Sequence, residues 1–112
     1  MKAFSLTVCL LVLPFLILAE NWPSWRKDHL GSGQTSETKL PTTWGPKENV
    51  LWRTELPEPG NSTPVIWGEH IYVTQPESLT KSRSLLCFDR KNGELLWKNG
   101  VIYEAEERSH RT

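Results

Sequence analysis

Three histidines, one of them beside an acidic residue, are the first side chains of this 112-residue chain to consider for metal binding or acid–base catalysis. His29, His70 and His110 are scattered at spacings unlike those of zinc ligands. Glu69 directly precedes His70, but successive side chains of an extended segment point to opposite faces. A solvated turn therefore explains this pair better than an acid–base pair. We assign no catalytic residue and no metal ligand.

The first nineteen residues (1–19) have the layout of a secretory signal peptide. Lys2 supplies a positive start, and residues 3–19 carry no charge and end at the small residue Ala19. The apolar stretch is shorter than the roughly 20 residues that span a bilayer, and Pro14 interrupts it. We therefore expect cleavage after Ala19 and a periplasmic or secreted protein that meets a membrane only through export.

The composition of the remaining chain excludes several classes of partner. Without Lys2, twelve Lys and Arg stand against thirteen Asp and Glu, so no basic surface for nucleic acid is predicted. Cys87 is then the single cysteine, which has no partner for an internal disulfide and most simply acts as a small buried hydrophobe. No phosphate-binding loop or nucleophile elbow occurs, and the residues themselves predict no cofactor.

Residues 20–47 predict an irregular lead-in rich in Trp and Pro. Their apolar positions follow neither the helical nor the strand period, and Pro and Gly interrupt the segment repeatedly. Trp22, Trp25 and Trp44 carry large apolar surfaces, which are usually buried against something. We expect an arm that lies across a folded body.

Residues 48–112 change to short alternating segments separated by turns, and no helical pattern occurs. The first segment, residues 50–56, predicts a strand with one wet side, because one face carries Arg53 and Glu55 and the other carries Val50, Trp52, Thr54 and Leu56. The class is therefore all-β. Four further strands are expected, the first two as a hairpin: 63–67, 70–74, 84–89 and 94–98.

Asn92 and Gly93 mark the tightest turn of the chain. This pair supplies the two positive-φ positions of a tight primed turn, so residues 94–98 should pair antiparallel with residues 84–89. Residues 75–83 are polar and contain a proline, which predicts a longer loop.

The eleven residues from Cys87 to Trp97 resemble the tryptophan docking motif of pyrroloquinoline-quinone-like (PQQ-like) β-propellers, Ala-x-Asp-x-x-Thr-Gly-x-x-x-Trp. Asp89, Gly93 and Trp97 match at the family spacing, while Cys87 replaces Ala and Asn92 replaces Thr. The resemblance implies structural roles for this motif. Asp89 would bond the turn backbone, Gly93 would permit the turn, and Trp97 would pack between neighbouring blades.

The lead-in carries a second likeness. Residues 21–26, 40–44 and 49–53 resemble the opening of exported propeller proteins common in planctomycete-type bacteria, which have a Trp-Pro-x-Trp-Arg signature after the signal. Lys27 and Asp28 stand where those proteins usually have Gly-Pro, so the local turn departs from the pattern.

The resemblance implies a partial β-propeller within residues 48–112. One four-stranded blade is present, with one strand of a neighbouring blade whose docking tryptophan would be Trp52. Closed propellers need at least four blades, and the tail 104–112 is polar where the next blade would begin. We expect an N-terminal fragment of a longer protein, whose partners are the remaining blades of that protein or another protein.

The acidic cluster of the tail is most simply a solvated loop: Glu104, Glu106 and Glu107.

The resemblance implies two functions. The favoured one is a non-catalytic binding or assembly scaffold, and the alternative is a quinoprotein dehydrogenase that uses pyrroloquinoline quinone and a divalent cation. Such enzymes need a catalytic carboxylate, Glu and Asn metal ligands and often an adjacent Cys pair. None of these can be assigned here, so the cofactor-binding residues stay unknown and the choice between enzyme and scaffold stays open.

Overall fold

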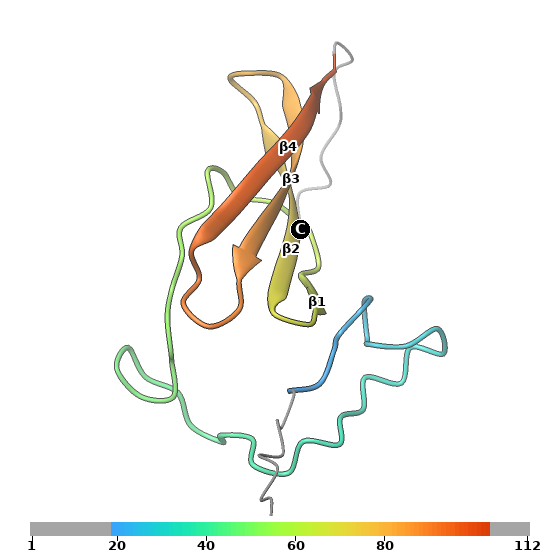
Figure 1. Cartoon of the computed structure of the whole chain (residues 1–112), viewed down its shortest axis with the longest axis vertical. Helices are drawn as coiled ribbons and strands as arrows, with labels where there is room; N and C mark the ends of the chain where they lie inside the picture. Colours follow the sequence, from blue (N-terminus) through green and yellow to red (C-terminus); the bar gives the residue numbers. More distant parts are fainter. Residues whose placement is uncertain (1–18, 104–112) are drawn as a thin grey trace, which may run out of the picture.

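The computed structural model describes residues 19–103, which contain one four-stranded antiparallel β-sheet (Figure 1). This part of the chain is all-β and has no helix, and so none that could cross a membrane. Except for Ala19, the expected signal peptide lies outside the described residues, as does the polar tail. The strands follow one another across the sheet in chain order: β1 (Val65–Trp67), β2 (His70–Glu77), β3 (Ser82–Asp89) and β4 (Leu95–Ile102).

Strand β2 is longer than the sequence predicts because it continues through Pro76, and the expected loop shrinks to residues 78–81. Thr74 donates its backbone N–H to Ser62 Oγ (3.0 Å), on the side of β2 away from β3. By strand alternation the nitrogen of Pro76 faces the same side. The first residue of β1, Val65, pairs with Tyr72, so β1 does not extend as far as Pro76. The missing N–H of Pro76 therefore removes no bond from a ladder.

Strands β1 and β4 also differ from their predicted bounds. Strand β1 begins at Val65 rather than residue 63, and the N–H of Thr74, which a longer β1 would use, is donated to Ser62 Oγ. Strand β4 runs to Ile102 rather than ending at Lys98. It does so because β3 begins earlier than expected, at Ser82, which pairs with Ile102.

The predicted strand at residues 50–56 is wrong. The segment joins no sheet because no strand lies beside it within the described chain. Side-chain alternation nevertheless persists at its centre, where Trp52 and Thr54 are half-buried and Leu51 is exposed. Leu56, expected on the buried face, is exposed. Alternation is thus a local property, whereas a ladder requires a neighbouring strand.

The loop between β3 and β4 is not the tight primed turn that Asn92 and Gly93 predict. Gly93 has φ +73°, but Asn92 keeps a negative φ. Gly93 N donates to Asp89 O (2.9 Å) and Asp89 N donates to Glu94 O (2.8 Å), so residues 90–93 form a four-residue connection. A primed turn needs two left-handed residues, and here glycine alone adopts that conformation.

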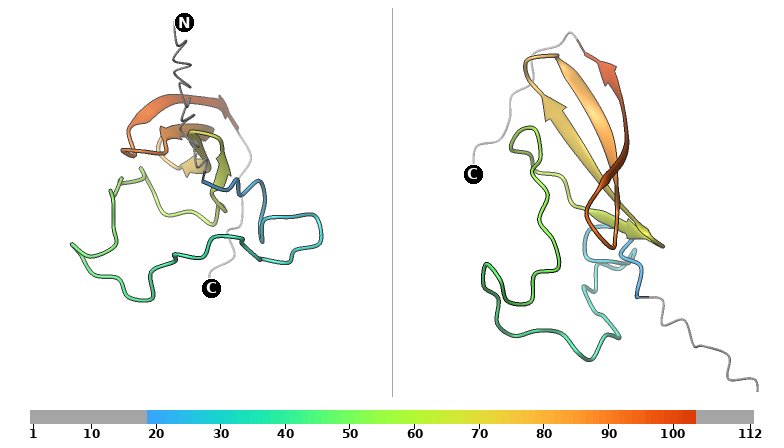
Figure 2. Two further views of the ribbon diagram at one scale, coloured as in Figure 1. Left: turned by 60° about the horizontal axis from the view of Figure 1, so that its bottom comes forward. Right: turned by 60° about the vertical axis from the view of Figure 1, so that its left-hand side comes forward.

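The hydrophobic core lies on one face of the sheet. Val73, Leu86 and Phe88 are buried there, and Ile71 packs against them. The segment 52–62 runs along one side of the sheet (Figure 2). It is tied to the core face where Gln75 Nε2 donates to Glu58 O. A single sheet therefore buries its apolar face under an irregular segment instead of under a second layer.

The lead-in arm departs from the sheet soon after its first contact. Trp22 forms two backbone hydrogen bonds with Ile66 of β1, N to O 2.8 Å and O to N 2.9 Å. The arm then runs away from the sheet (Figure 1). Trp25 and Trp44 are each 66% exposed, so the expectation that the arm buries its tryptophans against the body is wrong for these two. The reason is that the polar contacts of the arm are made largely within the arm itself.

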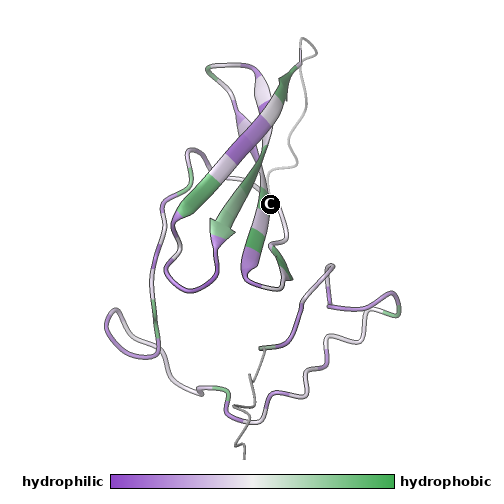
Figure 3. Cartoon of the chain, viewed as in Figure 1, coloured by the Kyte–Doolittle hydropathy of each residue, from purple (hydrophilic) through white to green (hydrophobic). Residues whose placement is uncertain are grey.

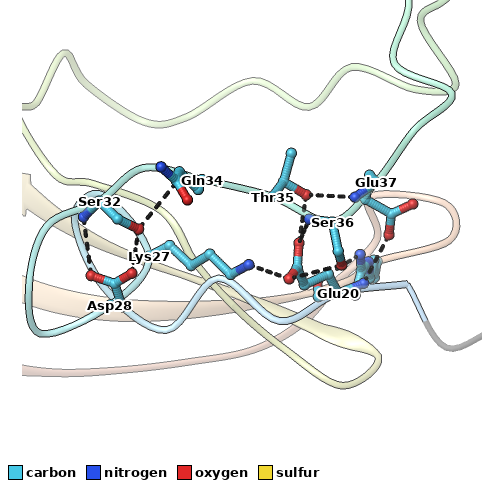
Figure 4. Close-up of polar contacts among 9 residues, drawn as sticks. Glu20, Lys27, Asp28, Ser32, Gln34, Thr35, Ser36 and Glu37 are labelled. Carbon is cyan, nitrogen blue, oxygen red and sulfur yellow. Dashed lines mark hydrogen bonds and ion pairs between the residues drawn. The ribbon is translucent and has the colours of Figure 1, made fainter.

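Two carboxylates organise the arm internally (Figure 4). Glu20 accepts hydrogen bonds from the Lys27 ammonium and the Thr35 hydroxyl. These partners, Lys27 above all, lower the pKa of Glu20 to about 2. Asp28 accepts hydrogen bonds from the hydroxyl and the N–H of Ser32, which hold the pKa of Asp28 below its ordinary value. The arm is therefore a series of small polar turns.

Candidate docking site

Asp89 shapes the loop that joins β3 to β4. Its Oδ1 accepts the N–H groups of Lys91 (2.7 Å) and Asn92 (3.3 Å). The side chain of Asn92 in turn accepts the N–H of Glu94 at Oδ1 (2.9 Å). These side-chain bonds satisfy the backbone donors of the loop and give it a compact shape before β4 begins.

Trp52 and Thr54 contact this loop from the extended segment 50–56. The Trp52 Nε1–H group donates to Arg90 O at 3.0 Å. Thr54 Oγ1 donates to Gly93 O at 2.7 Å. Alternation puts the two donors on the same side of their segment, so both reach the loop together. The segment is thus joined to the loop by two side-chain hydrogen bonds to loop carbonyls, and not by a backbone ladder.

Gly93 lies directly beneath Trp52. A Cβ atom on Gly93 would come within 2.6 Å of Trp52 Cδ2 and 2.7 Å of Thr54 Oγ1. Its φ of +73° is also in the left-handed region, which favours glycine. The position therefore needs glycine twice, once for the backbone conformation and once for the close approach of the indole.

Cys87 lies in the middle of β3, opposite Tyr72 of β2 and Trp97 of β4. It is fully buried. Burial raises the pKa of the Cys87 thiol, and a hydrogen bond with Tyr72 opposes the rise. The rings of Tyr72 and Trp97 are 6.1 Å apart and tilted by 54°. Cys87 therefore acts as a small apolar residue beside two aromatic rings.

Trp97 has a different environment from Trp52, although Leu-Trp followed by a basic residue occurs at both places. Trp97 belongs to β4, and 43% of its surface is exposed. Within the described part of the chain, the loop that begins at Asp89 accepts a hydrogen bond from the Trp52 indole and none from that of Trp97. The structure thus shows one tryptophan seated on a glycine loop and one on an open sheet face.

Arg90 is a contact residue that the motif did not indicate, because its position in the motif is unspecified. Its Nη1 donates to Gly68 O (3.1 Å) and Ala19 O (3.2 Å), and its Nη2 donates to Glu20 O (3.2 Å). Its carbonyl accepts the Trp52 indole N–H. One residue therefore joins the loop 90–93 to the β1–β2 turn and to the start of the arm.

A groove of about 1020 Å³ lies between the segment 58–62 and strands β2 to β4. Trp97, Tyr103 and Asn99 are among its lining residues. Gln75 also lines the groove, and its Oε1 is buried without a hydrogen-bond partner among the described residues. The lining combines aromatic faces with amide groups, which suits binding better than proton transfer.

The side chains considered for acid–base chemistry are not brought together. Glu69 forms an exposed ion pair with Lys91 (3.5 Å), and the His70 ring faces Tyr72 at 6.1 Å. His29 is exposed in the arm, and His110 lies outside the described residues. Among residues 19–103, no three His, Cys, Asp or Glu side chains are close enough to share a metal ion.

Comparison with known proteins identifies no relative. No family model matches the chain, and no curated protein or solved structure gives a match.

Proposed function

We propose that residues 48–103 are one blade and part of a neighbouring blade of a PQQ-like β-propeller. The protein is then an exported, non-catalytic scaffold for binding or assembly. The observation that carries the proposal is the seat of Trp52 on the loop between Asp89 and Gly93. This contact joins the strand-like segment to the four-stranded sheet at the motif that resembles a docking motif.

Three features support the propeller proposal together. The sheet has the four consecutive antiparallel strands of a propeller blade. Asp89, Gly93 and Trp97 have the spacing of the docking motif, and their loop receives an indole from a segment outside the sheet. In this proposal Trp52 of the neighbouring blade contacts the loop of this blade, and Trp97 contacts the corresponding loop of the following blade. An isolated blade leaves such a face open, because repeat units bury their apolar faces against neighbours.

The quinoprotein alternative has no assigned residue in this part of the chain. No group of three potential metal ligands gathers within residues 19–103, and Cys87 has no adjacent cysteine. The open aromatic and amide groove, by contrast, fits a surface that holds another molecule. This contrast favours a scaffold over a dehydrogenase for the part of the protein described.

The propeller proposal is tested by reading the coding DNA beyond Thr112. We expect several further copies of Asp-x-x-x-Gly-x-x-x-Trp, separated by about 40 to 50 residues as in propeller repeats. A stop codon directly after Thr112 would contradict a closed propeller made by one chain.

The scaffold proposal needs a separate test on the protein that this DNA encodes. The purified protein is incubated with pyrroloquinoline quinone and Ca²⁺, and reduction of an electron-accepting dye by alcohols and sugars is followed. A scaffold gives the same rate as a heat-denatured sample. Substrate-dependent reduction would establish the dehydrogenase instead.

A further inference from the structure

The outer edge of β4 presents unused backbone hydrogen-bonding groups. Tyr103 N donates to Lys81 O (2.8 Å), which places the N–H and C=O groups of Trp97, Asn99 and Val101, the odd-numbered residues beyond the β-bulge, toward β3. By alternation, the backbone groups of Lys98, Gly100 and Ile102 point to the other side. The sheet order ends at β4, so no strand of residues 19–103 pairs with that side.

This edge has few of the features with which proteins usually prevent strand pairing, since its β-bulge is confined to the start of β4, opposite Cys87 and Phe88. Strand β4 is eight residues long and contains no proline. Its one charged side chain, Lys98, forms an ion pair with Glu77 of β2 in the same sheet. Val101 and Ile102 are 67% and 79% exposed. A long, largely apolar edge whose one charged side chain is engaged within its own sheet is suited to receive another strand.

The side chains of β4 are arranged almost symmetrically about Asn99. Leu96 and Trp97 precede the polar centre of the strand, and Val101 and Ile102 follow it. Figure 3 shows this pattern as two hydrophobic ends of β4 that flank a hydrophilic middle. An antiparallel pair of identical strands places the two ends of the strand opposite each other. A sequence with apolar ends and a polar centre is therefore complementary to a second copy of itself.

We propose that β4 pairs antiparallel with β4 of a second copy of this chain, with the two-fold axis at Asn99, to form an eight-stranded sheet. In this register Trp97 faces the second copy's Val101, and Leu96 faces the second copy's Ile102. These are aromatic–β-branched and aliphatic cross-strand pairs, which stabilise sheets. The outward backbone groups of Lys98 meet those of the second copy's Gly100, as an antiparallel ladder requires.

The charge on β4 selects this register over its neighbour. When two identical strands pair antiparallel in one sheet, the two-fold axis passes midway between a residue and the same residue of the second copy. With the axis at Lys98, two ammonium groups would be directly opposite each other, which is destabilising. With the axis at Asn99, the two facing side chains are neutral amides, and each Lys98 faces a glycine. The pairing uses the sheet edge only, so it does not rest on the propeller proposal, in which blades pack through their faces.

Sedimentation of the full chain with the Lys98→Pro and Lys98→Gln variants tests the edge. Proline at position 98 removes an outward N–H and leaves the bonds between β3 and β4 in place. We expect the dimer dissociation constant to rise about tenfold or more for Lys98→Pro, which corresponds to one or two lost backbone hydrogen bonds. Lys98→Gln loses the same ion pair but keeps the N–H, and it should remain dimeric. A parent chain that sediments as a monomer at every concentration overturns the proposal.

Disulfide trapping of the full chain tests the register and does not depend on how proline is tolerated. Under mild oxidation, Asn99→Cys should give a cross-linked dimer, because the two sulfur atoms face each other across the axis. Lys98→Cys should cross-link at least several-fold more slowly, and the parent chain, whose Cys87 is buried, controls for its native cysteines. Faster cross-linking of Lys98→Cys overturns the proposed axis.

Discussion

The segments Leu51-Trp52-Arg53 and Leu96-Trp97-Lys98 are nearly the same in sequence but have different structures. The second belongs to β4 and is held by its ladder with β3, while its indole is 43% exposed. The first has no ladder, yet its indole is hydrogen-bonded and seated on Gly93. One segment is positioned by its backbone and the other by its side chains.

The comparison shows that a tryptophan contributes according to the surface opposite it. Trp52 meets a loop whose carbonyl at Arg90 accepts its N–H and whose glycine lets the ring approach. Trp97 meets Tyr72 on its own sheet. Trp52 therefore packs on a loop that accepts its hydrogen bond, whereas Trp97 has no such loop opposite it among the described residues. Substitutions at these places should have unequal effects, which the following experiments measure.

Gly93→Ala should have the largest effect. The new Cβ clashes with the Trp52 ring, and alanine is also strained at the positive φ of this position. Together these two effects should lower the unfolding free energy by about 2 to 4 kcal/mol. Urea unfolding followed by tryptophan fluorescence measures the change. Gly68→Ala is the matched control, because Gly68 has φ +58° but open space around its Cβ position. Equal losses for the two variants would show that the seat of the Trp52 ring contributes little.

Trp52→Ala should come next, with a loss of about 2 to 3 kcal/mol from a half-buried indole and its hydrogen bond. Trp52→Phe keeps an aromatic ring but loses the hydrogen bond and part of the contact of the indole with Gly93, so it should cost less than Trp52→Ala, about 1 to 2 kcal/mol. The same urea titration compares both with Leu51→Ala, whose side chain is 94% exposed. If Trp52→Ala matches Leu51→Ala, the docked arrangement is wrong.

Trp97→Ala should cost less, about 1 kcal/mol, because 43% of the Trp97 surface is already exposed and the ring makes no hydrogen bond within residues 19–103, so the variant loses mainly the contact with Tyr72. Chemical denaturation should therefore rank Trp97→Ala clearly below Trp52→Ala. This comparison requires protein below the concentration at which the chain self-associates, since Trp97 also lies on the β4 edge. The reverse order would mean that Trp97, and not Trp52, occupies the filled seat.

The smallest effect concerns the arm and depends on pH. The pKa of Glu20 is lowered from 4.5 to about 2 in the folded chain, so its ionised form stabilises the arm above about pH 4.5. That contribution should disappear progressively as the pH falls toward 2. The amide resonance of Ser36, whose N–H donates to Glu20, should report the change in an NMR titration. Glu20→Gln should abolish this transition, and its persistence in the variant would assign it to another group.

The sequence predicted the class of the fold and the presence and order of all four strands, because alternating apolar residues and turn formers are local signals. It missed the strand ends, as at Pro76, where the side of the strand that has no partner decides whether proline is tolerated. It also predicted a strand at residues 50–56, where alternation is present but a neighbouring strand is not. Strand ends and pairing depend on distant segments, which periodicity does not report.

The docking motif shows the same division at the level of single residues. By their type and spacing, Asp89 and Gly93 indicated a loop with a bonded backbone and a left-handed glycine, since these are properties of the residues themselves. The tertiary structure decided that Trp52 occupies the loop and that Arg90 joins it to the arm, because both contacts link segments far apart in the chain. The sequence by itself determined which groups could bond, and the folded arrangement determined which of them meet.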